Sequence, residues 1–186
     1  MNSYKILNKQ IYSLGDYSIV PIRFEDRYTI MKWRNEQIYH LRQNKILIAE
    51  DQDYYFNHVV LKLFDLDHPN QILFSYLDND VCIGYGGLVH INWIDRHAEI
   101  SFIIDTQLES NFFDQHWGIF LKLIEELAFA QLKLHKLSTF AFDLRPHLYV
   151  MLEKNNYLLD AVLKEHCLFD NKYVNVVMHY KLNYYE

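Results

Sequence analysis

The stretch "GYGGLVHINWIDRHAEISFIID", residues 84–105, decides the fold because it contains two strand patterns joined by a polar turn. In the second strand alternate side chains point to opposite faces, so Glu99 and Ser101 share the more polar face. A glutamate in such a strand is usually solvated or ion-paired, and Arg96 and Lys62 are candidate partners. The other interpretation is a carboxylate that lines a cleft and accepts a proton.

The segments around this stretch alternate between strand and helix patterns, without a repeat, a low-complexity segment or a linker. Gly84, Gly86 and Gly87 are candidates for a bulge or for a close approach between backbones. We therefore expect one mixed α/β domain that covers residues 1–186. Strands are expected at residues 17–24, 71–77, 81–91, 98–105, 136–143, 158–169 and 173–182, and helices at residues 25–36, 51–64, 116–134 and 146–156.

Composition limits the classes of function. The formal charge of −6 argues against a general nucleic-acid binder, which needs a concentrated cationic surface to neutralise phosphates. A phosphate-bearing small ligand stays compatible, since it needs only a few backbone N–H donors and one or two local cations. No window approaches the roughly 20 apolar residues of a membrane span, and the N-terminus lacks a signal-peptide pattern, so we expect a cytoplasmic protein.

Cysteine and histidine spacing predicts no metal site. Cys82 and Cys167 have no CxxC spacing, so free thiols are expected. None of the ten histidines forms an HxH or HExxH motif. Hydrolase, ATPase and dehydrogenase fingerprints are also missing from the sequence, which argues against those classes.

The order of elements resembles the GCN5-related N-acetyltransferase (GNAT) superfamily over roughly residues 17–182. Three segments carry the resemblance: "IVPIRFEDRYTIMKWRNE", the stretch quoted above, and the closing segment in which "LEKNNY" replaces the usual "YEKxGF". They are most similar to the branch of ribosomal-protein N-terminal and bacterial amino-sugar acetyltransferases. The resemblance implies an α+β fold, with a central, mostly antiparallel mixed sheet of about seven strands and helices on both faces.

The resemblance also implies acetyl-CoA as co-substrate. In the family a Q/R-x-x-G-x-G/A loop holds the coenzyme A pyrophosphate on backbone amides, and the matching stretch here is "QHWGI". Its residues Gln115, His116, Trp117 and Gly118 are the candidate phosphate-binding positions, with a cationic His116 donating its ring N–H. The match is eroded, because only one glycine remains and Asp114 places an anion nearby. The simpler interpretation is that these residues begin a surface helix.

Further cofactor contacts follow from the same resemblance. The family's strand parts from its neighbour and offers unpaired backbone groups to the pantetheine arm, which here assigns that role to Phe102, Ile103 and Ile104. Ordinary sheet packing is compatible with these residues as well. Arg145 stands where relatives often contact the cofactor, with a surface ion pair to Asp143 as the alternative.

The resemblance assigns the chemistry to Glu99. A protonated amine has no lone pair with which to attack a thioester, so a carboxylate must take its proton, and burial that raises the carboxylate's pKa improves the match to neutral pH. Many relatives protonate the leaving thiolate with a tyrosine, but Leu152 stands at the matching position. Tyr149, almost one helical turn earlier, is the candidate substitute, and a thiolate that leaves without help is the alternative.

The expected acceptor is a small-molecule primary amine, most specifically that of a nucleotide-linked amino sugar. Two alternatives are a protein α-amino group and a catalytically silent domain that binds an acyl-CoA or a partner protein. Open sheet edges make a homodimer compatible with the pattern. Three aromatic residues near the expected cleft are candidates for stacking on the acceptor: Phe74, Tyr85 and Trp93. Three histidines are candidates for a second base: His90, His147 and His166.

Overall fold

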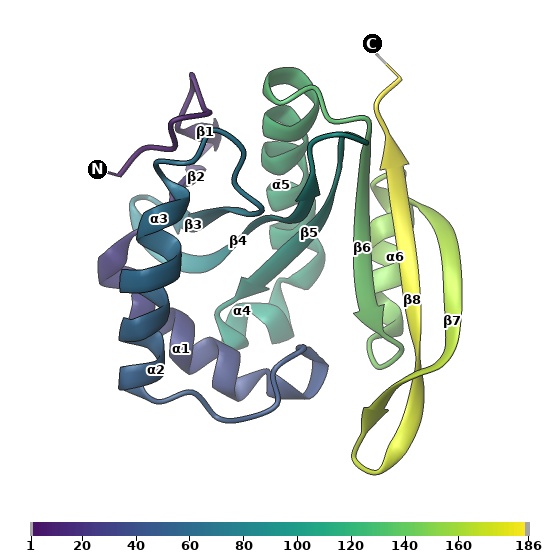
Figure 1. The fold of residues 1–186 in the computed structure, drawn as a ribbon. Coiled ribbons are helices and arrows are strands. Elements are labelled where there is room, and N and C mark those ends of the chain that lie inside the picture. Colours follow the sequence, from purple (N-terminus) through teal and green to yellow (C-terminus); the bar gives the residue numbers. More distant parts are fainter. Residues whose placement is uncertain (1, 185–186) are drawn as a thin grey trace.

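The computed structural model describes residues 2–184, which form an eight-stranded sheet in the order β1-β2-β3-β4-β5-β6-β8-β7 (Figure 1). All neighbouring strands run antiparallel except β5 and β6, which run parallel. This mixed sheet confirms the predicted α+β class, and β1 is an edge strand that the sequence did not predict. The strands are β1 (Tyr12–Leu14), β2 (Tyr17–Pro21), β3 (Ile72–Asp78), β4 (Val81–Asn92), β5 (His97–Ile104), β6 (Lys136–Phe142), β7 (Leu158–Phe169) and β8 (Lys172–Leu182).

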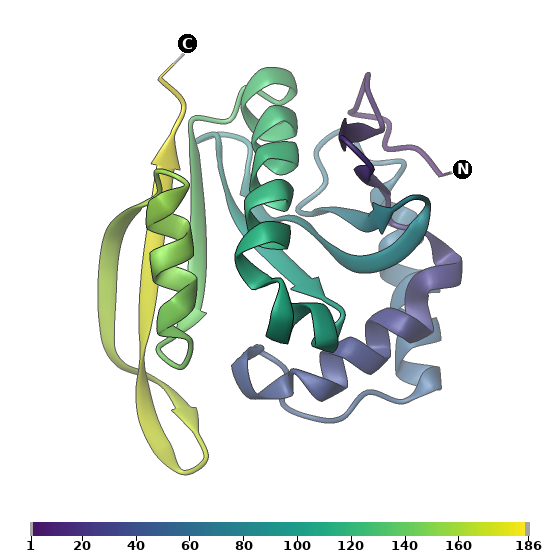
Figure 2. The same ribbon diagram turned by 180° about the vertical axis from the view of Figure 1, so that it is seen from behind.

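Helices lie on both faces of the sheet. The helices α2 and α3 pack on one face, α5 and α6 pack on the other, and α1 runs across the ends of the central strands (Figures 1 and 2). Two π-helical stretches, Phe56–Val60 and Glu126–Gln131, extend α2 and α5. The helices are α1 (Arg27–Glu36), α2 (Ala49–Tyr55), α3 (Leu61–Leu63), α4 (Thr106–Asn111), α5 (Phe113–Glu125) and α6 (Pro146–Lys154).

Glycines allow β4 to lie very close to its neighbours. A Cβ atom built on Gly86 would sit 2.2 Å from the carbonyl oxygen of Ser101, and one on Gly87 would sit 2.0 Å from that of Ile72. Real Cβ atoms do not approach backbone oxygen so closely, so only glycine fits at both positions. The predicted close backbone approach is therefore what these glycines provide, and it fixes β5 beside β4.

On its other side β5 separates from β6. The two strands pair only at His97–Lys136, Ala98–Leu137 and Glu99–Ser138, although β5 continues to Ile104 and β6 to Phe142. The strands thus part directly after Glu99 and leave their facing backbone edges without a strand partner. This gap, the β5–β6 cleft, is the feature that the sequence resemblance predicted.

The helix α5 anchors the apolar face of β5. Phe102 stacks on Phe120 with ring centroids 3.9 Å apart, and the Trp117 ring meets Phe102 edge-on at 5.1 Å. These three side chains are at most 5% exposed, so together they contribute several kcal/mol of apolar burial. The aromatic stripe of α5 is core, as its helical spacing indicates.

The connection between β5 and α5 differs from the expected loop. Residues of "DTQLESNFFD" form the separate helix α4, whose N-cap Asp105 accepts a hydrogen bond from the Gln107 N–H at 2.8 Å. α5 then begins at Phe113, three residues before the predicted start. Within residues 2–184 no helix is long and apolar enough to cross a membrane.

Candidate active site

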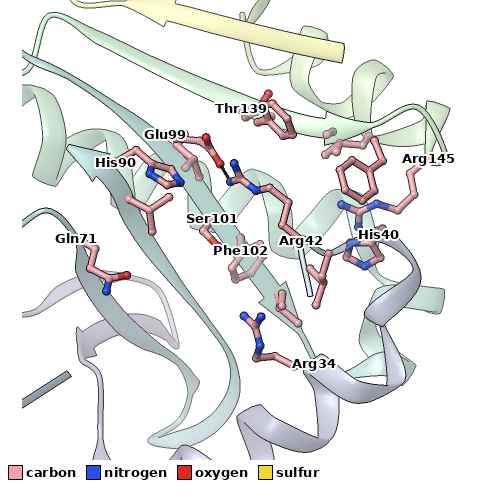
Figure 3. A pocket seen from close by; sticks show the side chains of 18 of the residues that line it. Arg34, His40, Arg42, Gln71, His90, Glu99, Ser101, Phe102, Thr139 and Arg145 are labelled. Carbon is pink, nitrogen blue, oxygen red and sulfur yellow. Dashed lines mark hydrogen bonds and ion pairs between the residues drawn. The ribbon is translucent and has the colours of Figure 1, made fainter. Parts of the chain in front are cut away.

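A cavity of about 500 Å³ occupies the β5–β6 cleft (Figure 3). Its walls come from Glu99–Ile103 on β5 and Thr139–Phe142 on β6, so it opens where the two strands stop pairing. Trp117 of α5 and the segment after α1 close its sides. The polar side chains that line it include Arg34, His40, Arg42, Gln71, His90, Glu99, Ser101, Thr139 and Arg145.

Glu99 lies on the wall of this cavity and forms an ion pair with Arg42, toward which its carboxylate points in Figure 3. The Glu99 side chain is 14% exposed, and this burial raises its pKa, with Arg42 and His90 opposing the rise. Arg42 also lies over the Phe140 ring, 4.5 Å from its centroid. A mostly buried carboxylate of raised pKa is suited to accept a proton near neutral pH.

The observed partner of Glu99 differs from both candidates that the sequence suggested. Neither Arg96 nor Lys62 pairs with it, and Arg42 reaches it from a loop 57 positions earlier. No local spacing signal connects residues so far apart, because the pairing depends on the way α1 and the following segment cross β5. Only the tertiary fold brings Arg42 to the cleft.

Two buried polar atoms in the cavity wall have no hydrogen-bond partner among the described residues. They are the Thr139 hydroxyl on β6 and Nδ1 of His40, whose Nε2 faces the Gln37 side chain at 3.3 Å. Unpaired buried polar atoms cost free energy unless a ligand or water satisfies them. Together with the unpaired strand edges, they fit a polar, elongated ligand such as the pantetheine arm of an acyl-CoA.

Comparison with known sequences decides the family. The sequence model described as an acetyltransferase (GNAT) domain matches residues 19–177, which is most of the chain. The chain belongs to the GNAT acetyltransferases. It is accordingly an acetyl-CoA-dependent N-acetyltransferase.

Solved structures share this GNAT fold. A spermidine N-acetyltransferase from Vibrio cholerae, in complex with CoA and spermine, superposes with a TM-score of 0.80 at 18% identity, over 91% of this chain and 97% of that one. A dodecameric spermidine N-acetyltransferase from the same organism gives a TM-score of 0.75 at 19% identity, over 91% and 95% of the two chains. At this identity the likeness establishes the fold only.

The stretch that the resemblance assigns to the phosphate loop is helical in this chain. Gln115, Trp117 and Gly118 all lie within α5, and the amide of His116 already donates to the Phe112 carbonyl at 3.1 Å. The Gln115 side chain donates to the Tyr17 hydroxyl at 3.1 Å, and Trp117 lines the cavity. Any amides offered to phosphate must therefore come from the first residues of α5.

The structure does not support a cationic His116. Its side chain is 3% exposed, and Nδ1 lies 3.2 Å from the Tyr76 hydroxyl. Burial lowers the pKa of His116, so the neutral ring is favoured at pH 7. The ring contact of His116 to a phosphate therefore stays a prediction, and burial of the ring does not favour it. Asp114 is turned to Lys154, 2.8 Å away on α6.

Arg145 does reach the cavity, although its partner is Glu109 and not Asp143. The Arg145 Nη1 lies 2.9 Å from a Glu109 carboxylate oxygen, and both side chains are about nine-tenths buried. Burial raises the pKa of Glu109, and Arg145 opposes the rise. This ion pair connects α4 with the residue that precedes α6 at the outer end of the cleft.

The β5 residues assigned to the pantetheine arm lie along the cleft. Phe102 and Ile103 line the cavity, and on their other edge they pair with Gly86 and Tyr85 of β4. The carbonyl of Ile104 accepts a hydrogen bond from the Gln37 side chain at 2.7 Å. That carbonyl is occupied, and the Ile103 carbonyl faces β4, so Phe102 is the residue whose backbone groups face the cleft.

Tyr149 is turned away from the cavity. Its hydroxyl donates to Asp143 at 3.1 Å, and its ring stacks on His179 with centroids 5.4 Å apart. Burial raises its pKa. The Tyr149 side chain does not itself line the cavity, although its hydroxyl also donates to the carbonyl of Phe142, a residue of the cavity wall, at 3.3 Å. Leu152 is buried in the core.

Of the remaining candidates, His147 and His166 are exposed outside the cavity. His90 lines the cavity beside Glu99, whereas His147 packs on Phe113 and His166 lies near Phe140. Of the aromatic candidates, only Tyr85 borders a cavity, the second one described below. Phe74 is fully buried, and the Trp93 indole donates to the Pro69 carbonyl at 2.9 Å. In the described part of the chain no group of three or more His, Cys, Asp and Glu side chains forms a metal site.

Proposed function

We propose that this chain acetylates a small-molecule primary amine in the β5–β6 cleft, with Glu99 as the base and a nucleotide-linked amino sugar as the acceptor. The observation that carries the proposal is the position of Glu99, which lies mostly buried on the cavity wall at the point where β5 and β6 separate. Acetyl-CoA supplies the acetyl group as a thioester.

In the proposed reaction the amine must lose protons before and after it attacks the thioester. Glu99 takes one proton from the ammonium form of the acceptor, directly or through water, and thereby frees the nitrogen lone pair. The nitrogen then bonds to the thioester carbonyl carbon, the carbon–sulfur bond breaks, and the second proton lost by the nitrogen passes to the departing thiolate or to water. The backbone N–H group of Phe102, which faces the cleft, polarises that carbonyl. The thiolate leaves without Tyr149, since that hydroxyl is turned toward Asp143.

The acceptor assignment rests on the size and polarity of the site. A cavity of about 500 Å³ with a polar lining is large enough for a sugar-sized acceptor beside the thioester. The solved neighbours are named for spermidine and spermine, so a polyamine is the second candidate for this chain. An association of two copies stays a prediction. It is supported by the exposed apolar side chains Leu158, Leu159 and Val162 of the edge strand β7.

The test is release of free thiol from acetyl-CoA with a panel of amine acceptors. We expect turnover with wild type, and Glu99→Gln should lower kcat by about 10²- to 10⁴-fold, the usual contribution of a general base. Glu153→Gln is the matched control, because it makes the same change at an exposed position of α6. Equal rates for Glu99→Gln and wild type at neutral pH would exclude Glu99 as the base. If none of the acceptors in the panel gives thiol release, a silent acyl-CoA-binding domain is favoured.

A further inference from the structure

Arg34 of α1 points into the cavity and differs from the other two arginines there (Figure 3). Its Nε donates to the Gln43 side chain at 2.9 Å, and its Nη1 donates to the Tyr85 hydroxyl at 2.5 Å. Both partners are neutral groups. Arg42 and Arg145, in contrast, each pair with a carboxylate, Glu99 and Glu109.

No carboxylate compensates the charge of Arg34. Within residues 2–184 no Asp or Glu oxygen lies within 4.0 Å of its guanidinium. Asp51 lines a second cavity that Arg34 also borders, but its carboxylate forms an ion pair with the Lys45 ammonium group at 2.9 Å. A partly buried cation without a counter-ion is costly, and an anionic ligand group would remove that cost.

Arg34 also borders a second cavity, of about 240 Å³, beneath α1 and α2. This cavity is largely apolar and aromatic, and Tyr55, Phe56 and Tyr85 contribute three rings to its lining. The guanidinium therefore stands between a polar cavity that contains Glu99 and an aromatic cavity. An acceptor that passes Arg34 can place its amine in the first cavity and a ring in the second.

Charge at this position separates the candidate acceptors. The guanidinium is a planar fork of N–H donors that binds phosphate or carboxylate oxygens bidentately. The main cavity is lined by three arginines and one carboxylate. A polyamine carries several positive charges and would bring each of them near these guanidinium groups at an energetic cost.

We infer that Arg34 binds an anionic group of the acceptor, a phosphate or a carboxylate, and that the enzyme consequently selects amines that carry negative charge over polyamines. The inference rests on the proposed function, because it assumes that the amine acceptor occupies the cavity with Glu99. Arg34 is a specificity-determining residue in this account and takes no part in the proton transfer.

The experiment measures binding of the acceptor separately from turnover. Isothermal titration with CoA present at saturation, so that the cofactor's own phosphates are already bound, compares UDP-glucosamine, glucosamine 6-phosphate, glucosamine and spermidine. We expect the two phosphorylated amines to bind best. Arg34→Gln should weaken their binding by about 10- to 100-fold, the usual effect of losing a charge-assisted hydrogen bond. The affinity for glucosamine should change less than threefold.

Two variants complete the design. Lys32→Gln removes one positive charge from the exposed side of the same helix and should leave every affinity unchanged. Arg34→Glu should reverse the order, with spermidine bound better than the phosphorylated amines. Amino derivatives of galacturonate carry a carboxylate in place of a phosphate. Comparing their affinity with that of the phosphorylated amines shows which anion Arg34 prefers.

The outcomes separate this inference from the proposed function. If wild type binds spermidine best, or if Arg34→Gln binds phosphorylated amines as tightly as wild type does, the inference is overturned. If binding depends on Arg34 but no acceptor releases thiol from acetyl-CoA, the inference stands and the acetyl transfer to these amines is wrong.

Discussion

The charge on Glu99 is set by two opposing effects, and they can be separated by removing one of them. Burial raises its pKa, and Arg42 is the largest influence that lowers it. The base must be ionised to accept a proton, so activity falls as the pH drops through this pKa. In this way the ion pair keeps the base available at lower pH than burial alone would allow.

Arg42→Gln should therefore move the acidic limb of the pH–rate profile to higher pH. Without the guanidinium, burial acts almost unopposed, and Glu99 becomes protonated at a pH at which the wild-type carboxylate is still ionised. The measurement is kcat/KM against pH with a single acceptor. Lys32→Gln serves as the control at an exposed site. An acidic limb that stays in place, or moves to lower pH, would contradict the assignment.

His40 predicts a stability effect at the same scale. Burial and the nearby Arg145 lower its pKa from 6.5 to about 3, so the folded protein keeps this ring neutral. Because the folded-state pKa is depressed, its contribution to stability is complete above pH 6.5 and is lost as the pH falls toward 3. Between pH 7 and pH 5 the cost of the neutral ring is about 2 kcal/mol.

The variant His40→Gln should remove that pH dependence. Urea unfolding at pH 7 and pH 5 measures the free energy of unfolding, and the difference between variant and wild type should shift by about 2 kcal/mol in the variant's favour at pH 5. His116 and His179, whose pKa values burial also lowers, are present in both proteins and cancel in this comparison. A difference that does not change with pH would show that His40 titrates normally.

At the scale of elements, the glycines Gly86 and Gly118 have different roles in the structure. Gly86 on β4 meets the Ser101 carbonyl, whereas a Cβ on Gly118 would lie 3.7 Å from the Asn155 side chain, an ordinary contact. The sequence resemblance assigns Gly118 to a phosphate loop, and the structure places it in the second turn of α5. One glycine is required by packing and the other is a weak point of a helix.

Substitution of these two glycines by alanine should consequently change the free energy of unfolding in opposite directions. Gly86→Ala should lower the free energy of unfolding by about 3 kcal/mol, because β4 or β5 must move to accommodate the new methyl group. Gly118→Ala should raise it by up to about 1 kcal/mol through helix propensity, with the KM for acetyl-CoA unchanged. Thermal or urea unfolding measures the free energy of unfolding of both variants, and the thiol-release assay measures the KM for acetyl-CoA. A large rise in KM for Gly118→Ala would restore this glycine to the phosphate site.

The elements that local pattern could predict are those with clear periodicity. The strand that carries Glu99 and the long helix α5 both follow from alternation and from helical spacing. α4 was missed because the six residues of this helix have no apolar stripe, and it is held by the Asp105 cap. β1 was missed because three residues give too short a pattern, and its place depends on pairing with β2.

At the scale of the whole molecule, the cleft could be predicted from the sequence, and the ion pairs that line it could not. Element order and glycine spacing were sufficient for the family and for the position of Glu99. The pairs Arg42–Glu99 and Arg145–Glu109 join residues 57 and 36 positions apart, and they form only when the sheet and helices have packed. The charge of the site, which carries the inference about the acceptor, therefore depends on tertiary structure.

Binding of acetyl-CoA should stabilise the entire fold. A ligand at 100 times its dissociation constant adds about 2.7 kcal/mol to the free energy of unfolding when it binds only the folded state. Differential scanning fluorimetry with increasing acetyl-CoA should thus show a rising Tm. An unchanged Tm at millimolar acetyl-CoA would mean that the altered phosphate loop no longer holds the co-substrate.

The account depends on the separation of β5 from β6 after Glu99, and a crystal structure with CoA tests it most directly. We predict that the pantetheine arm lies between Phe102–Ile103 on β5 and Ala141–Phe142 on β6, with its sulfur directed toward Glu99. A structure in which the two strands pair along their whole length, or in which CoA binds on another face of the sheet, would contradict it.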